Sequence, residues 1–426
     1  MKYTHKKYEN GLNLFLLPLK DAESVVFTIM VKVGSRYEEQ KLAGITHFLE
    51  HMFFKGSKKY PTSELISTSV DAIGGDWNAM TGKETTEFYI RASKKNFKFI
   101  FDLLTDMLHN PLFDATEIER EKGVILEEMK MYRDNPRSRA EENLDKAMWP
   151  NTRLGEEIIG DEKSLKGITQ TDLFNYWRTW YVPANIVLGV AGNFNEVVAE
   201  NLIKKTWGSL PKQKVPKMFW ADQVKINSSD TSRMIFENRK IEQASISLGF
   251  ISYAHADKKI PALRLLSSII GGGMSSRLFI RLREKLGLAY SIYAYSEGYY
   301  ETGMFMVNAG LRSDSVDKAL TIIGEELKTL IKTKVTEEEL RKTKEQSKGR
   351  MALGLEDPQS KLDFIIGQFV MTGKILTTEE VYRRVDKVSI TDIQNVAKEI
   401  FSSKRMALSA VGPITNQDKL KKSIKI

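Results

Sequence analysis

Two of the five histidines of this chain stand four residues apart, and a glutamate directly precedes the second one. They are His47 and His51, with Glu50 between them. An α-helix turns by about 100° per residue, so Glu50 lies at about −60° and His51 at about +40° from His47. All three polar groups then project from one helix face, where burying them costs free energy unless they bind something. Two imidazoles at this spacing can hold one zinc ion, and a carboxylate beside them can take a proton from water. The alternative is a pair of unrelated core histidines with a salt-bridging glutamate.

A second segment offers carboxylates at helical spacing. Glu121 and Glu128 stand seven residues apart within a predicted helix over residues 115–132, so their side chains fall within about 20° of each other. We expect apolar residues on the same face, namely Val124, Ile125 and Tyr132. Acids are rarely buried without partners, so one glutamate is expected to bind the metal and the other to orient a ligand. The alternative is a charged helix whose acids face solvent.

These side chains need a scaffold, and the sequence predicts one of mixed strands and helices. Apolar runs typical of strands occupy residues 12–17, 25–33, 86–92 and 186–192. Helices are predicted over residues 97–108, 115–132 and 43–54, the last of which is apolar nearly all round and therefore buried. In the second half, a strand over 244–250 precedes a helix over 261–270, which repeats the order of the first half.

The similarity of the two halves extends to residue spacing. Residues 117–138 align without gaps to residues 339–360, an offset of 222, and Thr171-Asp172 resembles Thr391-Asp392 at an offset of 220. We interpret this as a tandem duplication of about 220 residues, although two charged helices can also align by chance. A polar, proline-bearing stretch separates the copies. The predicted domains are therefore residues 1–210 and 233–426, joined by a linker over 211–232.

Composition narrows the classes of protein that the chain can belong to. It has 426 residues, of which 42% are hydrophobic and 28% charged, as in an ordinary globular protein. The absence of cysteine excludes disulfides, thiolate nucleophiles and cysteine-based metal sites. The net charge of +9 comes from basic residues spread along the whole chain, with no recognisable nucleic-acid-binding motif. No apolar run approaches the roughly 18 residues of a membrane helix, and residues 1–20 lack the features of a signal peptide. We expect a cytoplasmic protein that binds neither nucleic acid nor membrane.

Residues 44–56, Gly-Ile-Thr-His-Phe-Leu-Glu-His-Met-Phe-Phe-Lys-Gly, resemble the zinc peptidases of the pitrilysin family, which carry this inverted motif. The resemblance is strongest to the branch of the mitochondrial processing peptidase β subunit and its bacterial homologues. Residues 124–129, Val-Ile-Leu-Glu-Glu-Met, resemble the stretch that carries the family's glutamate ligand, and Glu128 follows His51 at a spacing similar to the family's. The resemblance implies that His47, His51 and Glu128 hold one Zn2+ per chain, with Glu50 as general base and Glu121 as the partner carboxylate.

A glycine-bearing segment further along the chain is similar to the family's substrate-binding strand. Residues 74–79, Gly-Gly-Asp-Trp-Asn-Ala, resemble the segment that leads into an edge strand beside the metal. In such enzymes an extended peptide is held there by strand addition. The resemblance therefore implies that Asn78 and Ala79 contact the substrate. The alternative is a simple turn.

The second half lacks the metal ligands. At a constant offset of 222, Ile269 stands opposite His47, Gly273 opposite His51 and Arg350 opposite Glu128, so this copy is not expected to bind the metal in the same way. Residues 271–273 are three glycines, but the Lys-Ser/Thr of a phosphate-binding P-loop does not follow them. A loop beside the substrate is expected there instead.

The second half carries another motif that resembles the family. Arg283 and Tyr290, seven residues apart, are similar to the family's arginine–tyrosine pair. The resemblance implies that they hold the substrate and stabilise the charge that develops on its carbonyl oxygen. The alternative is a basic helix face next to a packed tyrosine. Because large members of the family join two such units, we expect this chain to form a homodimer in which Arg283 and Tyr290 act in trans.

The sequence thus predicts an α+β fold of two homologous domains, each an antiparallel-rich sheet flanked by helices. The predicted activity is that of a zinc endopeptidase of the bacterial cytoplasm, which cleaves short or unfolded peptides in an enclosed chamber. A different class stays open, that of a non-catalytic structural or partner subunit of a heteromeric peptidase or respiratory complex. Such subunits typically lose zinc ligands, whereas this chain keeps all of those that the motif requires.

Overall fold

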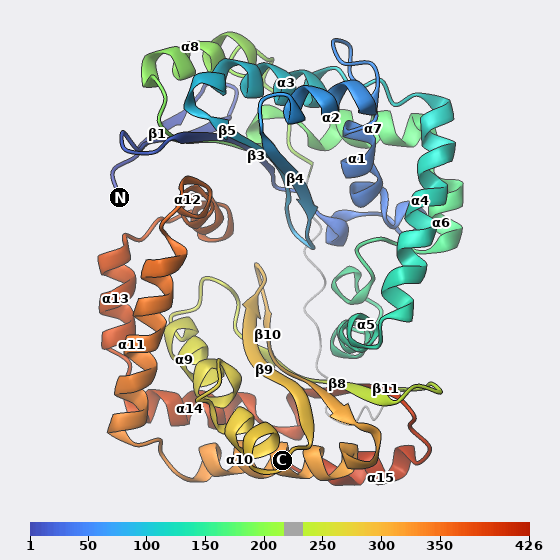
Figure 1. Cartoon of the computed structure of the whole chain (residues 1–426), viewed down its shortest axis with the longest axis vertical. Coiled ribbons are helices and arrows are strands. Elements are labelled where there is room, and N and C mark those ends of the chain that lie inside the picture. The colour runs from blue at the N-terminus through green and yellow to red at the C-terminus, as the bar shows by residue number, and fades with distance from the viewer. Residues whose placement is uncertain (217–232) are drawn as a thin grey trace. The chain divides into compact units, whose positions relative to one another are not determined.

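The computed structural model describes residues 1–216 and 233–426, which form two compact units (Figure 1). Unit 1 comprises residues 1–129, 157–216 and 354–375, and unit 2 comprises residues 130–156, 233–353 and 376–426. Most of the predicted linker over 211–232 lies outside the described residues. Within these ranges, no helix combines the length and apolarity needed to cross a membrane.

Unit 1 is built on a six-stranded sheet with the order β1-β2-β6-β3-β5-β4. The strands are β1 (Thr4–Lys7), β2 (Asn13–Pro18), β3 (Ser24–Val31), β4 (Asp76–Thr81), β5 (Thr86–Ser93) and β6 (Ile186–Gly192). Only β2 and β6 pair in parallel among these strands, and β4 forms one edge. The central strand β3 is covered on both faces, which explains its nearly continuous apolar sequence.

Helices cover both faces of this sheet. The helices of unit 1 are α1 (Ile45–Phe53), α2 (Ser63–Asp71), α3 (Phe97–His109), α4 (Ala115–Asp134), α6 (Glu162–Gly167), α7 (Gln170–Trp180), α8 (Glu196–Thr206) and α12 (Pro358–Thr372). Helix α4 belongs to unit 1 as far as Met129, and its last turn belongs to unit 2. Helix α3 packs on β3 and β5, and Figure 1 shows α12 on the opposite face, where it contacts β3 and β6.

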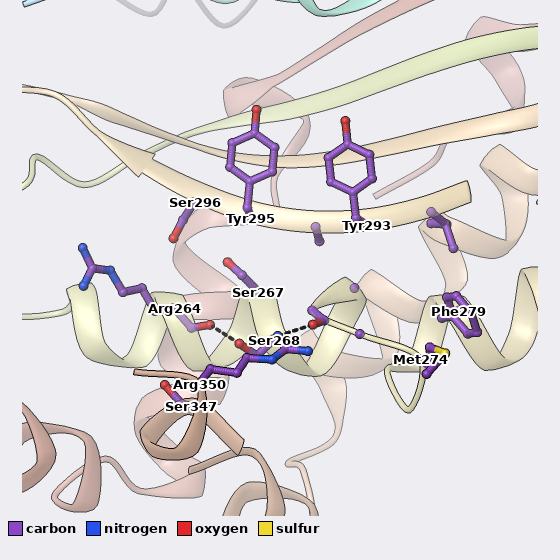
Figure 2. A pocket seen from close by; sticks show the side chains of 15 residues that line it. Arg264, Ser267, Ser268, Met274, Phe279, Tyr293, Tyr295, Ser296, Ser347 and Arg350 are labelled. Carbon is purple, nitrogen blue, oxygen red and sulfur yellow. Dashed lines mark hydrogen bonds between the residues drawn. The ribbon is translucent and has the colours of Figure 1, made fainter. Parts of the chain in front are cut away.

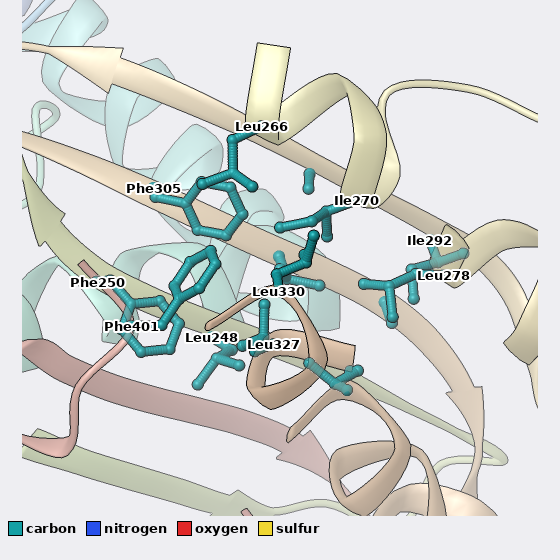
Figure 3. Close-up of a cluster of buried hydrophobic side chains, with 14 of the residues drawn as sticks. Leu248, Phe250, Leu266, Ile270, Leu278, Ile292, Phe305, Leu327, Leu330 and Phe401 are labelled. Carbon is teal, nitrogen blue, oxygen red and sulfur yellow. The ribbon is translucent and has the colours of Figure 1, made fainter. Parts of the chain in front are cut away.

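Unit 2 repeats this plan with a five-stranded sheet of the order β7-β11-β8-β10-β9. Its strands are β7 (Met234–Asn238), β8 (Gln243–Ser252), β9 (Ala289–Gly298), β10 (Gly303–Arg312) and β11 (Met406–Gly412). Its helices are α5 (Pro136–Met148), α9 (Ile260–Gly271), α10 (Val316–Lys332), α11 (Glu337–Gly354, up to Leu353), α13 (Thr378–Asp386), α14 (Ile390–Ile400) and α15 (Gln417–Ser423), with a π-helix, η7, over Phe279–Lys285. Figure 3 shows part of the core, in which side chains such as Phe250, Leu266 and Phe305 are buried together.

The two halves of the chain exchange one helix each. Helix α5 follows α4 in the first half but packs on β8 and β11 of unit 2, whereas α12 from the second half packs on β6 of unit 1. A glycine lies at each contact, where a Cβ at Gly189 would lie 2.5 Å from Cδ1 of Ile366, and one at Gly249 would lie 3.1 Å from Cδ2 of Leu144, so a larger residue would displace these side-chain ends. The predicted α+β fold with two sheet domains is confirmed, but each compact unit draws one helix from the other half.

Candidate metal centre

Helix α1 presents the inverted motif, and its first turn is fixed by a buried carboxylate. Glu38 accepts hydrogen bonds from the backbone N–H groups of Gly44, at 2.7 Å, and Thr46, at 2.8 Å. These groups have no partner inside the helix, so the acidic cap satisfies them and complements the helix dipole. Gly44 has a φ of 90°, and a Cβ there would lie 2.4 Å from the carbonyl oxygen of Ile159. The helix therefore begins at one defined residue.

The polar side chains of α1 share one face, as their spacing predicts. His47, Glu50 and His51 are half-buried. The remaining faces enter the core through apolar side chains, namely Ile45, Phe48, Leu49, Met52 and Phe53. Burial of those apolar groups fixes the rotation of the helix, and this rotation directs the polar face toward α4.

Helix α4 supplies the two carboxylates. Glu121 is buried and Glu128 is half-buried, on the side where Ile118, Ile125 and Met129 enter the core. The prediction that Val124 and Tyr132 share this face is wrong, because their side chains are 48% and 39% exposed. The buried stripe follows positions 118, 121, 125 and 129, so Val124 lies to one side of it and Tyr132 lies beyond its last buried residue.

Three ligand atoms converge between α1 and α4. Nε2 of His47 lies 3.8 Å, and Nε2 of His51 3.4 Å, from the same oxygen, Oε2 of Glu128. One ligand atom from each of these residues lies within 4.8 Å of the others. Tetrahedral ligands at 2.0–2.1 Å from zinc are separated from one another by about 3.3 Å, so this donor set fits a zinc ion. Periodicity alone left Glu121 and Glu128 as alternatives, the family resemblance favoured Glu128, and Glu128 is the carboxylate that faces both Nε2 atoms.

Glu121 lies behind His51. The Nδ1 atom of His51 donates a hydrogen bond to Glu121 at 2.8 Å, and the ammonium group of Lys55 lies 2.6 Å from the other carboxylate oxygen. Burial raises the pKa of Glu121, but the hydrogen bonds with His51 and Lys55 outweigh it and lower the pKa. For His51, burial opposes protonation, while hydrogen bonds to Glu121 and Glu128 raise its pKa to about 9. Glu121 thus orients His51 so that Nε2 faces Glu128.

His47 has a different environment from His51. Burial, followed by the nearby charge of His51, lowers the pKa of His47 to about 4. Its Nδ1 atom is buried and has no hydrogen-bond partner among the described residues. The ring is therefore neutral at pH 7, the state in which an imidazole coordinates a metal ion.

Glu50 contacts the edge strand of the sheet. The hydroxyl of Thr81, the last residue of β4, donates a hydrogen bond to Oε2 of Glu50. Burial raises the pKa of Glu50, and this hydrogen bond partly offsets the increase. Sequence reasoning missed Thr81, Glu38 and Lys55. Only Thr81 carried a signal, since strand alternation places it on the same side of β4 as Trp77 and Ala79.

The predicted substrate-binding residues lie on β4 itself. Asn78 and Ala79 stand in the middle of this edge strand, which pairs on one side only, with β5, in the described part of the chain. Asn78 is exposed, and its Oδ1 atom accepts a hydrogen bond from the backbone N–H of Ala79 at 2.9 Å. The strand that ends beside Glu50 thus presents a free edge.

The predicted arginine–tyrosine pair lies in unit 2, whereas the metal ligands lie in unit 1. Arg283, in the π-helix, is exposed, and its guanidinium lies 4.9 Å from the ring centre of Phe279. Tyr290 is 56% exposed. It occupies the extra position of a β-bulge, because Gly310 pairs with Ser291 and Leu311 with Ala289. Bulges often redirect a side chain, and here the bulge presents the Tyr290 ring to solvent.

Comparisons with known proteins identify the family of this chain. The model of the insulinase family, peptidase family M16, matches residues 16–162, and that of the M16 inactive domain matches residues 167–347. Uncharacterized zinc proteases of Bacillus subtilis and Rickettsia felis are both 33% identical, covering 96% and 93% of this chain and 99% and 94% of their own lengths.

Solved structures share the fold. A protease from Helicobacter pylori superimposes with a TM-score of 0.89 at 23% identity, covering 97% of this chain and 99% of the other. A structure from Pseudomonas fluorescens, described as a peptidase M16 inactive domain, gives a TM-score of 0.87 at 19% identity, covering 98% and 100%. Since the two family models together match more than half of the chain, this protein belongs to peptidase family M16.

Proposed function

We propose that this protein is a zinc-dependent endopeptidase that hydrolyses short or unfolded peptides. The observation that carries the proposal is the convergence of two imidazole Nε2 atoms on one oxygen of Glu128, beside the carboxylate of Glu50. A purely structural role would leave three half-buried polar groups facing one another at a cost in free energy. The relatives named as zinc proteases support the same assignment.

Each polar residue of the site has a role in the proposed mechanism. His47, His51 and Glu128 would hold the metal. When bound, zinc supplies Lewis-acid chemistry that polarises a carbonyl group and makes water more acidic. Glu50 takes a proton from the attacking water and returns it to the leaving amine. Glu121 holds His51 in orientation, and Thr81 positions the Glu50 carboxylate through its hydrogen bond.

The substrate would bind as an extended strand along β4, within an enclosed chamber, and contact Asn78 and Ala79. Its backbone would add to the free edge of the sheet next to Glu50, a mode that depends on backbone more than on side chains. Arg283 and Tyr290 would stabilise the charge on the substrate carbonyl oxygen. Both side chains are exposed, so they are accessible to a substrate.

The test is hydrolysis of a quenched, unstructured peptide by the wild type, by Glu50→Gln and by the control Glu64→Gln, which changes an exposed residue of α2. We expect one zinc per chain in all three proteins, and a loss of kcat of at least about 100-fold in Glu50→Gln alone, since general acid–base catalysis contributes 10²–10⁴-fold. Equal cleavage by Glu50→Gln would contradict the mechanism. Wild-type protein without zinc would instead support the alternative of a non-catalytic partner subunit.

The homodimer is a separate part of the proposal. If Arg283 and Tyr290 act on the active site of a partner chain, mixing an Arg283→Ala chain with a Glu50→Gln chain gives dimers in which one of the two active sites is intact. That site has Glu50 from the first chain and Arg283 from the second. We expect activity to reappear after the chains are mixed and re-equilibrated. Mixed dimers that stay inactive would show that the pair does not act in trans.

A further inference from the structure

Unit 2 contains a cavity of about 560 Å3 between α9, β9 and α11 (Figure 2). Its polar lining consists mainly of two arginines and four serines, namely Arg264, Arg350, Ser267, Ser268, Ser296 and Ser347. The three glycines at the end of α9, residues 271–273, complete the wall. None of the residues found to line the cavity is acidic, so the lining carries two formal positive charges.

Within the part of the chain that the structure describes, neither of these arginines has a carboxylate partner. Arg350 donates a hydrogen bond to the carbonyl oxygen of Gly272, and no acidic partner of either guanidinium is found among the described residues. Arg277 of the same unit behaves differently, since it forms a two-pronged ion pair with Glu339. Two guanidinium groups that line one cavity, without a carboxylate partner among the described residues, favour the binding of an anion.

Sheet register shows which part of unit 1 corresponds to this cavity. Val31 of β3 pairs with Ile186, the first residue of β6, and Phe250 of β8 pairs with Met406, the first residue of β11. Since β6 and β11 occupy the same place in their sheets, Val31 and Phe250 are equivalent positions.

The same register extends to the edge strands. Val31 pairs with Thr86 of β5, which pairs with Thr81 of β4. In unit 2, Phe250 pairs with Phe305 of β10, which pairs with Ser296 of β9. Ser296 of the cavity therefore corresponds to Thr81, the residue that holds Glu50 in unit 1.

The helices complete the correspondence. The burial patterns of α1 and α9 coincide when their buried residues are matched in pairs, such as Phe48 with Leu265, Leu49 with Leu266, Met52 with Ile269, and Phe53 with Ile270. In this alignment Arg264 corresponds to His47, Ser267 to Glu50 and Ser268 to His51, while the constant offset of 222 between α4 and α11 makes Arg350 the counterpart of Glu128.

The constant offset of 222 predicted from the sequence is therefore wrong for α9. It places Ile269 opposite His47, but the Ile269 side chain is buried in the core and does not line the cavity. In the strands, Val31 stands opposite Phe250, and in the helices, Phe48 stands opposite Leu265. The chain from Phe250 to Leu265 is two residues shorter than the chain from Val31 to Phe48, so the connection between strand and helix is two residues shorter in the second copy.

We infer that this cavity is a converted copy of the metal centre, which binds an oxyanion, a phosphate or carboxylate group, in place of a cation. Each position that faces the metal site in unit 1 carries a cationic or hydroxyl side chain in unit 2. A Cβ at Gly273 would lie 2.6 Å from Nη2 of Arg350, so glycine at this position gives the guanidinium its space. The hydroxyl of Ser296 is a further donor for anionic oxygens, whereas the hydroxyls of Ser267 and Ser268 donate to the carbonyl oxygens of Leu263 and Arg264 and would have to rotate to reach an anion.

Calorimetric titration tests this inference without measuring activity. The probes are inorganic phosphate and a short peptide with either a free C-terminal carboxylate or an amide. The proteins are the wild type, Arg264→Gln, Arg350→Gln and the control Arg281→Gln, which removes an equal charge from an arginine paired with Glu325 and Glu326 outside the cavity.

We expect each cavity variant to weaken oxyanion binding at least about tenfold, since a charged hydrogen bond contributes about 1.5–3 kcal/mol, while the control binds like the wild type. Competition between the probes identifies the source of the anion, because only a carboxylate-binding cavity distinguishes the free peptide from its amide. Equal loss in the control would trace binding to the general positive charge and overturn the inference. Failure of the wild type to bind any probe would also overturn it. Ser268→Asp places a carboxylate inside the cavity and should abolish binding without removing an arginine.

Discussion

The Nδ1 atom of His51 lies 2.8 Å from a carboxylate oxygen of Glu121, and this contact leaves Nε2 of the same ring facing Glu128. A histidine can bind a metal through either nitrogen, and the hydrogen bond at one nitrogen selects the other. Lys55 holds Glu121 from the opposite side. The charge of the buried carboxylate is thus shared between a lysine and an imidazole, and the ligand is oriented in advance.

Removing the charge of Glu121 should weaken metal binding. We expect Glu121→Gln to reduce zinc affinity about 10–100-fold, the usual effect of losing such an outer carboxylate. Competition with a chromogenic chelator measures this affinity. Glu119→Gln is the control, because Glu119 is an exposed residue of the same helix that pairs with Lys122. If both variants bind zinc like the wild type, Glu121 does not orient His51. The melting temperature of each protein, measured with excess chelator, reports the stability of the metal-free fold. It therefore separates a loss of zinc affinity from a loss of folding stability.

The acidic cap of α1 should contribute to stability. Glu38 accepts two backbone hydrogen bonds while buried, so Glu38→Gln turns an amide NH2 toward one of the N–H groups. We expect a loss of about 1–3 kcal/mol in the free energy of unfolding, the cost of an unsatisfied buried group. Urea denaturation of the metal-free protein measures it. The adjacent Glu39→Gln changes an exposed side chain and should have an effect below about 0.5 kcal/mol. Similar losses in both variants would contradict the capping role.

A buried carboxyl pair should make unit 1 less stable at alkaline pH. Glu87 of β5 lies beside Asp363 of α12, and the amide of Gln359 donates to Asp363 at 2.7 Å. Burial, with the charge of Asp363, raises the pKa of Glu87 to about 8. The folded state therefore holds a proton that the unfolded state loses above the ordinary pKa of 4.5, so this group lowers stability as pH rises from about 4.5 to about 8.

The variant Glu87→Gln resembles the protonated form at every pH. We expect its melting temperature to match that of the wild type near pH 5 and to exceed it at pH 8–9, by about 2–4 °C for each kcal/mol. The exposed Glu9→Gln should show no such pH-dependent difference. A constant difference between Glu87→Gln and wild type across this range would contradict the assignment.

The correspondence between the two copies predicts that a metal site can be rebuilt in unit 2. The triple variant Arg264→His, Ser268→His and Arg350→Glu restores the ligand types of unit 1 at the equivalent positions. We expect its zinc content to exceed that of the wild type by one ion per chain, measured by elemental analysis after gel filtration. Arg350→Glu alone supplies one ligand and should not add an ion. A folded triple variant with the zinc content of the wild type would contradict the equivalence.

The sequence alone determined the parts of the site that follow from local helix geometry. His47, Glu50 and His51 share a face because their spacing places them there on any helix, and the same holds for Glu121 and Glu128. The central strands were predictable for a similar reason, since apolar runs such as residues 25–33 must be buried in any fold. The family resemblance added the choice of Glu128 as the metal ligand, and the Arg283–Tyr290 motif of the second half.

Tertiary structure decided which of these faces meet and which residues support them. Glu128 and Glu121 were equivalent by periodicity, and only the packing of α4 against α1 brings Glu128 to both Nε2 atoms and places Glu121 behind His51. Thr81 and Glu38 reach α1 from a strand and a loop, contacts that no local pattern encodes.

The sequence did not predict the exchange of α5 and α12 or the altered alignment of α9 with α1. Both have one physical reason. Sequence spacing fixes angles within one helix or strand. The length of a connection and the close approach of a helix to a glycine in a sheet determine which elements meet, and these depend on residues far apart in the chain.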